Sequence, residues 1–196
     1  NNVATKSYTN TLYIIMKKPK SLLIIISSVL LIGILYWNFN VQIKGYLLSK
    51  HAIFWKKDVE LKPSDFKAQI DQNSKSEIWV YFGLYLKSTN LKDAEVKAYF
   101  DKNKSWVKDT LNFKDEIEFQ KLRFDLYENY ARKFNKEIDK IKFDEDKYFS
   151  DLEKIGDKIY SELNIMEDSL YNTDLEKNEL IKFWRLKIDK MLKTKN

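Results

Sequence analysis

A long run of apolar residues without charges lies near the start of the chain. Residues 21–37 carry no charge, and at about 1.5 Å per helical residue they span roughly 26 Å. Phe39 and Val41 extend the run toward the thickness of a bilayer's hydrocarbon core. The pattern therefore predicts a single transmembrane helix over residues 21–41.

The flanks of this run indicate its orientation in a membrane. Lys17, Lys18 and Lys20 precede it, with no acidic residue among the first 20 positions, which predicts that the N-terminus lies inside. A cleaved signal peptide is the competing interpretation, but no pattern of small residues suited to cleavage follows the run. The residues assigned to an uncleaved anchor are Leu22, Ile26, Leu30, Gly33, Tyr36 and Trp37.

After the anchor, alternation of side chains with a period of two predicts strands. Residues 77–86 are apolar on both faces, and residues 94–100 alternate apolar with polar side chains. A shorter strand is predicted over residues 52–55. We expect the two longer strands to form an antiparallel pair in a small sheet.

The second half of the chain has apolar residues spaced three and four apart, which predicts helices. One helix is expected over residues 112–143, a second from Asp144, and a third capped by Thr173 or Asp174. The fold class is therefore α+β, a small antiparallel sheet packed on three or more helices. The predicted organisation is a cytoplasmic segment over 1–20, the anchor over 21–41, a juxtamembrane linker over 42–51 and the domain over 52–196.

Composition excludes several classes of function. The chain of 196 residues has 35 basic and 29 acidic residues, and the two signs are interleaved, which favours a solvated surface over a nucleic-acid-binding one. It has no cysteine and one histidine, His51, so a typical zinc site with three protein ligands has too few donors. We expect no cofactor, no metal, no nucleic-acid partner and no small-molecule substrate.

Arg123 interrupts the apolar stripe of the long predicted helix, which includes Phe119, Leu122 and Leu126. A guanidinium keeps its charge, so Arg123 must either extend to solvent or find a carboxylate, and both possibilities stay open. The carboxylates considered as its partner are Asp125, Glu128 and Asp174.

The neighbours of Arg123 form a longer pattern. They are Phe124, Asp125, Glu128, Tyr130, Ala131 and Arg132, with Phe100-Asp101 and Ser105-Trp106 upstream and Tyr171-Asn172-Thr173-Asp174 downstream. In order and spacing, these residues resemble a family of secreted bacterial proteins of otherwise unknown function, described as predicted zinc-dependent proteases. In that family HExxH is followed by Phe-Asp and then by Glu-x-Tyr-Ala-Arg. The resemblance implies a zincin-like domain.

On this resemblance, the zinc-binding residues have been replaced. The first histidine falls on Phe119, the general-base glutamate on Gln120, the second histidine on Arg123 and the third ligand on Lys177. None of these side chains is a usual zinc ligand, and the Gln120 amide cannot act as a base. The resemblance thus implies a degenerate site in which Arg123 is a fixed cation in place of the metal.

The leading hypothesis is a membrane-anchored, catalytically inactive pseudo-peptidase. We expect it to be a single-pass protein of the bacterial cytoplasmic membrane, with its domain in the periplasm or outside. The expected partners are membrane lipid, through the anchor, and other membrane or envelope proteins. The protein would then serve as an accessory or scaffold subunit.

Two alternatives belong to other classes of function. A hydrolase without zinc would use carboxylates, with or without a hard cation such as calcium or magnesium. The carboxylates considered are Asp115, Glu116, Glu118 and Asp125. An envelope-polymer-binding module would instead use exposed aromatic rings, for which Trp79, Tyr81 and Trp106 are the candidates.

Overall fold

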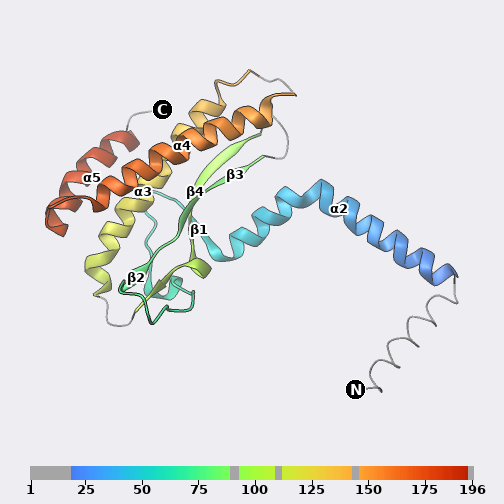
Figure 1. Cartoon of the computed structure of the whole chain (residues 1–196), viewed down its shortest axis with the longest axis horizontal. Coiled ribbons are helices and arrows are strands. Elements are labelled where there is room, and N and C mark those ends of the chain that lie inside the picture. Colours follow the sequence, from blue (N-terminus) through green and yellow to red (C-terminus); the bar gives the residue numbers. More distant parts are fainter. Residues whose placement is uncertain (1–18, 89–92, 109–111, 143–145, 194–196) are drawn as a thin grey trace, which may run out of the picture. The chain divides into compact units, whose positions relative to one another are not determined.

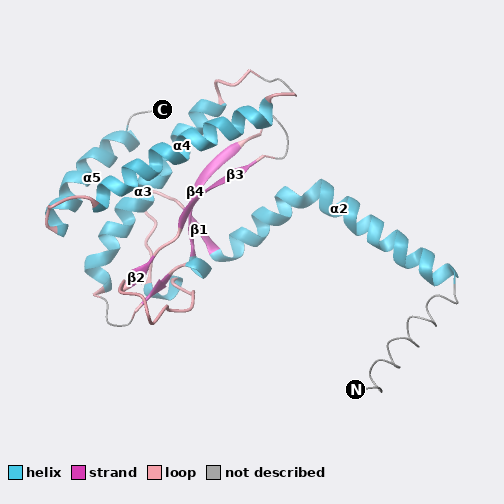
Figure 2. Cartoon of the chain, viewed as in Figure 1, coloured by secondary structure: helices cyan, strands magenta, loops and turns pink. Residues whose placement is uncertain are grey.

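A computed structural model of the chain describes residues 19–88, 93–108, 112–142 and 146–193 (Figure 1). It combines helices with small antiparallel sheets, as the sequence predicts (Figure 2). The chain divides into two units, Asn1–Lys44 and Gly45–Asn196. The second unit contains the sheets and all helices after the first apolar one.

The apolar N-terminal helix α2 covers Pro19–His51. It is long and apolar enough to cross a membrane, a property that signal sequences share. All six predicted anchor residues lie in α2 with exposed side chains, whereas Lys17 and Lys18 lie outside the described residues. The predicted linker over 42–51 is helical instead. It contains no proline and a single glycine, so nothing in it ends the helix.

The main sheet has three antiparallel strands in the order β1-β4-β3. β1 is Ala52–Phe54, β3 is Phe82–Lys87 and β4 is Glu95–Asp101, which confirms the predicted strands over 52–55 and 94–100. Phe100 in the central strand faces Ile53 on one side and Phe82 on the other. Its side chain has no solvent exposure, so the core is centred on β4.

The predicted continuous strand over 77–86 is wrong. A separate strand, β2 (Ile78–Trp79), pairs with β5 (Trp106–Val107), while β3 pairs with β4. The 3₁₀ turn η2 (Lys102–Lys104) separates β4 from β5, so the segment opposite has no continuous partner strand. At the break, the Tyr81 amide donates to Ser105 Oγ at 2.9 Å.

An asparagine side chain completes the free edge of β4. The amide of Val96 donates to Asn135 Oδ1 at 2.7 Å, and Asn135 Nδ2 donates to the Val96 carbonyl at 2.8 Å. β1 is too short to pair at this position, and the Asn135 amide supplies the two missing hydrogen bonds. This contact fixes the last turns of the long helix against the sheet.

Three helices follow the strands: α3 (Phe113–Ile138), α4 (Tyr148–Tyr171) and α5 (Lys177–Lys193). The long helix ends before the predicted residue 143, and the predicted start of the second helix at Asp144 lies outside the described residues. The predicted cap of the third helix is wrong. Thr173 Oγ1 accepts from the Leu175 amide in the preceding loop, and α5 begins only at Lys177.

The helix α3 is central in the domain, between the main sheet and the pair α4 and α5 (Figure 1). It is therefore buried on more than one face, which a single apolar stripe does not predict. The buried apolar side chains of α3 are Phe119, Leu122, Phe124, Leu126, Tyr127, Tyr130, Ala131 and Phe134. Polar residues on α3 are thus brought into the interior, where they need partners.

Candidate functional site

A cavity of about 680 Å³ lies between the segment around β2, the first half of α3 and the end of α4. Phe119, Gln120 and Arg123, three of the four positions of the predicted degenerate site, line it. Lys177 lines a smaller cavity of about 270 Å³ that shares Glu116 and Phe119 with the larger one. The structure therefore brings the four positions into one region.

A chain of hydrogen bonds connects three of these positions. Lys177 at the start of α5 forms an ion pair with Glu116 Oε2 on α3. Gln120 Nε2 donates to Glu116 Oε1 at 2.8 Å, and Arg123 Nη1 donates to Gln120 Oε1 at 2.7 Å. Gln120 is only 3% exposed, so its amide needs both bonds.

The chain continues from Arg123 to the helix α4. Arg123 Nε and Nη2 donate to Glu167 Oε1 at 3.0 and 2.5 Å, and the Tyr127 hydroxyl donates to Glu167 Oε2 at 2.9 Å. The rings of Phe82 and Tyr171 lie 5.3 and 5.6 Å from the guanidinium carbon. With 11% and 16% of the two side chains exposed, Arg123 and Glu167 form a largely buried ion pair, and Arg123 does not extend to solvent.

The three carboxylates predicted as partners of Arg123 were wrong. Asp125 lies only two positions further along α3, so its side chain points away from that of Arg123. Glu128 instead accepts a hydrogen bond from Arg132 Nε at 2.8 Å, and Asp174 is exposed in the loop before α5. The true partner, Glu167, is on a helix whose alignment with α3 the sequence does not specify.

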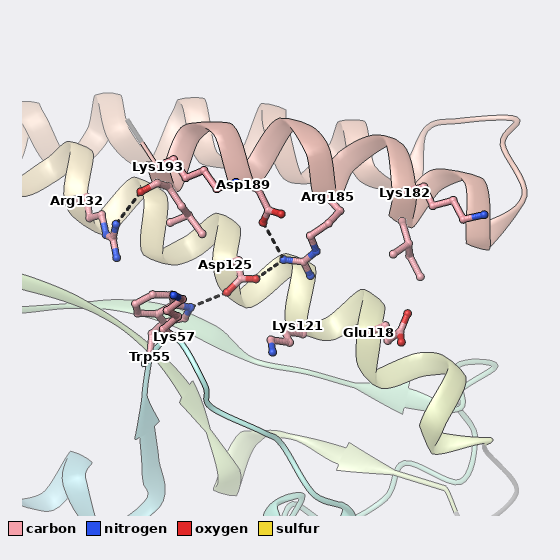
Figure 3. A pocket seen from close by; sticks show the side chains of 12 residues that line it. Trp55, Lys57, Glu118, Lys121, Asp125, Arg132, Lys182, Arg185, Asp189 and Lys193 are labelled. Carbon is pink, nitrogen blue, oxygen red and sulfur yellow. Dashed lines mark hydrogen bonds and ion pairs between the residues drawn. The ribbon is translucent and has the colours of Figure 1, made fainter. Parts of the chain in front are cut away.

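Asp125 belongs to a second region, where it connects three elements. Its Oδ1 accepts from Trp55 Nε1, just after β1, at 2.7 Å, and its Oδ2 pairs with Arg185 of α5 (Figure 3). Arg185 also lies 3.6 Å from Asp189. Asp125 is 5% exposed, and both of its oxygens are occupied.

Arg132 holds the other end of α5. Its Nη1 donates to the Leu192 carbonyl at 3.1 Å, and its guanidinium lies 5.2 Å from the centre of the Trp55 ring. This bond satisfies a carbonyl in the last turn of α5, which has no partner within the helix. Burial raises the pKa of Glu128, and the bond from Arg132 opposes that shift.

The carboxylates considered for a non-zinc hydrolase do not converge. Glu116 faces the cavity with Arg123, whereas Glu118 and Asp125 line the cavity on the other side of α3. The side chain of Asp115 lies outside the described residues. Within the described ranges, no three histidine, cysteine, aspartate or glutamate side chains gather as a metal-binding set. His51 Nδ1 instead lies 2.9 Å from the buried Asp101.

The three aromatic residues considered for polymer binding have different environments. Trp79 is 57% exposed, whereas Trp106, its partner across β2 and β5, is 7% exposed. The ring of Tyr81 is covered by Lys104, whose Nζ lies 4.3 Å from the ring centre. Trp79 therefore remains as the one exposed ring of the set.

Comparison with known proteins finds no significant match. No protein-family model, no curated protein and no solved structure is similar enough to assign this chain to a family. The functional argument therefore rests on the residues of the two regions described above.

Raising the pH above about 10 is expected to destabilise the domain. Burial and the Glu167 carboxylate raise the pKa of Tyr127 above its ordinary value of 10.0, and burial raises the pKa of Tyr99. The unfolded chain therefore releases tyrosine protons first. The stability that these neutral hydroxyls contribute is complete below pH 10 and falls as the pH rises through the folded-state pKa values.

An alkaline titration that follows tyrosinate absorbance and circular dichroism together checks this expectation. The last tyrosines should ionise only as the helical signal is lost. Tyr127→Phe has no hydroxyl to ionise at this position, so it should lose less stability between pH 7 and the alkaline transition than the unmodified chain does. Complete ionisation of all tyrosines in a chain that keeps its native circular dichroism would contradict it.

Proposed function

We propose that this chain is a membrane-anchored, catalytically inactive pseudo-peptidase that binds other membrane or envelope proteins as an accessory or scaffold subunit. The observation that carries the proposal is the polar network from Lys177 through Glu116, Gln120 and Arg123 to Glu167. It occupies the positions at which the resemblance places a metal and its base. The network holds α3, α4 and α5 together, and the side chains of Gln120, Arg123 and Lys177 are not zinc ligands.

Charge supports this view of the region. The Arg123 guanidinium keeps its charge at any physiological pH and is fixed between a carboxylate and two rings. A second fixed cation, Lys177, lies at the other end of the network. Two cations in place of two ligands repel a divalent ion, so the site is suited to holding helices rather than to activating water.

The residues of this chain that match the family pattern support a scaffold function. Asp125 joins α3 to β1 and α5, and Arg132 caps α5. The Tyr130 hydroxyl donates to the Glu162 carbonyl of α4 at 3.2 Å, and Ala131 is 1% exposed. These residues maintain packing, and they do so without the metal ligands. The chain thus has the packing residues of the family pattern without its metal ligands, which supports a binding function over a catalytic one.

The two alternatives have less support. A carboxylate-based hydrolase needs two available carboxylates in one cleft, but both oxygens of Asp125 are engaged and Glu116 pairs with Lys177, which leaves Glu118 alone without a partner among the described residues. A polymer-binding surface usually presents several rings, and only Trp79 of the proposed set is exposed. We propose that α2 anchors the chain in a bacterial cytoplasmic membrane, with the domain outside. Its length and apolar composition support a membrane-spanning helix.

The test is the state of the chain after mild detergent extraction from native membranes. We expect it to elute in a complex larger than the protein–detergent particle, with defined partner chains identified by mass spectrometry. Replacing residues 21–41 with an unrelated apolar helix separates contacts made by the anchor from those made by the domain. The complex should survive this replacement.

Two results would contradict the proposal. Elution of the native chain alone, as a monomer, under conditions that preserve other membrane complexes would remove the accessory role. Peptide hydrolysis by the purified chain, abolished by Asp125→Asn but not by Glu95→Gln, would show that the domain is an enzyme. Glu95 is a suitable control because it is an exposed carboxylate on β4 that pairs with Lys97, and neither residue lines one of the two cavities.

A further inference from the structure

The second cavity has a volume of about 780 Å³ and is formed by α3, α5 and the segment after β1 (Figure 3). Six basic and three acidic side chains line it, so its charge is unbalanced, unlike the interleaved surface of the helices. The basic residues are Lys57, Lys121, Arg132, Lys182, Arg185 and Lys193, and the acidic ones are Glu118, Asp125 and Asp189.

Four of these cations have no anionic partner among the described residues. The guanidiniums of Arg132 and Arg185 pair with Glu128 and Asp125. By contrast, the ammonium groups form no hydrogen bond or ion pair with any residue in the described part of the chain. These groups belong to Lys57, Lys121, Lys182 and Lys193. Unpaired lysines at a concave surface create a positive potential that attracts anions.

The acidic residues of the cavity do not neutralise these lysines. Asp125 is buried and already bonded to Trp55 and Arg185, and Asp189 lies beside Arg185. Glu118 is the single lining carboxylate without a partner among the described residues. Some exposed helical lysines elsewhere pair with near neighbours, as Lys154 does with Asp151, whereas others, such as Lys136, have no partner among the described residues. The cavity differs in bringing four unpaired lysines to one concave surface.

The free cations are distributed along the cavity instead of meeting at one point. Lys182 and Lys193 are three helical turns apart on α5, which corresponds to about 16 Å along its axis. Lys121 of α3 and Lys57 lie on the opposite wall (Figure 3). A single small anion cannot contact both ends, so the spacing suits a ligand that carries several anionic groups.

We propose that this cavity binds a ligand bearing two or more phosphate groups. Lysine ammonium groups bind phosphate as compact point charges, and the two guanidiniums, which could pair with phosphate or carboxylate, are already engaged here. Trp55, Ile181 and Leu192 add apolar surface for an organic portion of the ligand. The site is on the face of α3 opposite the Arg123 network, and it does not depend on whether that network replaced a metal.

Titration of the full chain with tripolyphosphate tests the proposal. The chain is placed in nanodiscs of phosphatidylcholine, and binding is followed calorimetrically at low and high salt. We expect saturable binding to one site that weakens as salt rises. The double variant Lys121→Ala/Lys182→Ala should bind about tenfold more weakly, because two nearby charges are lost. The control Lys136→Ala/Lys158→Ala removes two exposed helical lysines outside the cavity and should leave the affinity unchanged.

Two outcomes would overturn the proposal. If binding does not saturate, or if the control variant loses as much affinity as the cavity variant, the attraction is a property of the whole basic surface. If citrate binds as tightly as tripolyphosphate, the preference for phosphate is wrong. The comparison is valid if both the cavity and the control variants keep their helical circular dichroism.

The source of the phosphate is distinguished by the lipid of the disc. If phosphatidylglycerol in the disc weakens tripolyphosphate binding by the unmodified chain, and this competition is lost in the cavity variant, lipid headgroups occupy the site. If phosphatidylglycerol has no effect while tripolyphosphate still binds, the site takes a soluble or polymeric phosphorylated ligand. Either result supports the cavity as a phosphate site.

Discussion

Replacing Glu167 with alanine is expected to lower the free energy of unfolding of the domain by about 3 kcal/mol or more. The substitution removes the carboxylate that accepts from Arg123 and from the Tyr127 hydroxyl. Arg123 is 11% exposed and cannot reach solvent without leaving its place between the rings of Phe82 and Tyr171. A buried guanidinium without a partner is therefore left behind. Chemical unfolding of the full chain in detergent, followed by tryptophan fluorescence, measures the change.

A matched control is available on the same helix. Glu162 pairs with Lys133, but these side chains are 32% and 43% exposed, so Glu162→Ala should cost only about 0.2–1 kcal/mol. The double variant Arg123→Met/Glu167→Leu removes both charges of the buried pair and should recover part of the lost stability, because Gln120 Oε1 and the Tyr127 hydroxyl still lose their partners. Equal losses for Glu167→Ala and Glu162→Ala would show that Arg123 reaches solvent after all.

Periodicity predicted the helices and strands well where one side of an element faces water. The apolar positions of β4 and α5 alternate with charged ones, and their burial follows that alternation. The prediction of one strand over residues 77–86 fails because the alternation within a strand does not show where its partner strand is interrupted. The turn η2 and Ser105 make that interruption, and they lie 20 residues or more further along the chain.

Contacts between elements that are far apart in the sequence could not be predicted from the sequence. Arg123 stood out because it is a charge in an apolar stripe, and this indicated that a partner was needed. The partner Glu167 looks like any solvated glutamate of α4, and only the alignment of α3 with α4 brings it to Arg123. The same holds for Asn135 at the edge of β4 and for Arg185 beside Asp125. A buried charge signals that a bond exists, whereas its partner depends on the tertiary packing.

The four positions that the resemblance assigns to a zinc site are a different case, because the resemblance predicts that they lie together. Phe119, Gln120 and Arg123 share a helix face by spacing alone, but Lys177 is more than fifty residues away. Its ion pair with Glu116, one turn from Gln120, places it beside the others. The derivation of these positions from a metal site stays a prediction, and restoring the ligands tests it directly.

The triple variant Phe119→His/Arg123→His/Lys177→His is expected to bind one zinc ion, which the unmodified chain should not do. The substitutions supply three imidazoles and remove two cations. They also leave Glu116 and Glu167 without their basic partners, so the metal-free variant should be less stable than the unmodified chain. Zinc restores positive charge beside those carboxylates and should recover stability by about 2.7 kcal/mol when free zinc exceeds the dissociation constant a hundredfold.

Equilibrium dialysis with elemental analysis gives the stoichiometry, and the visible absorption of bound cobalt reports the coordination of the same site. The control is Lys114→His/Glu118→His, which places two histidines one turn apart at exposed positions of α3 and introduces no third histidine. It should bind zinc more weakly and gain little stability. If the folded triple variant binds no better than this control, the four positions do not derive from a metal site. The zincin resemblance then fails, while the phosphate cavity and any complex in native membranes keep their own tests.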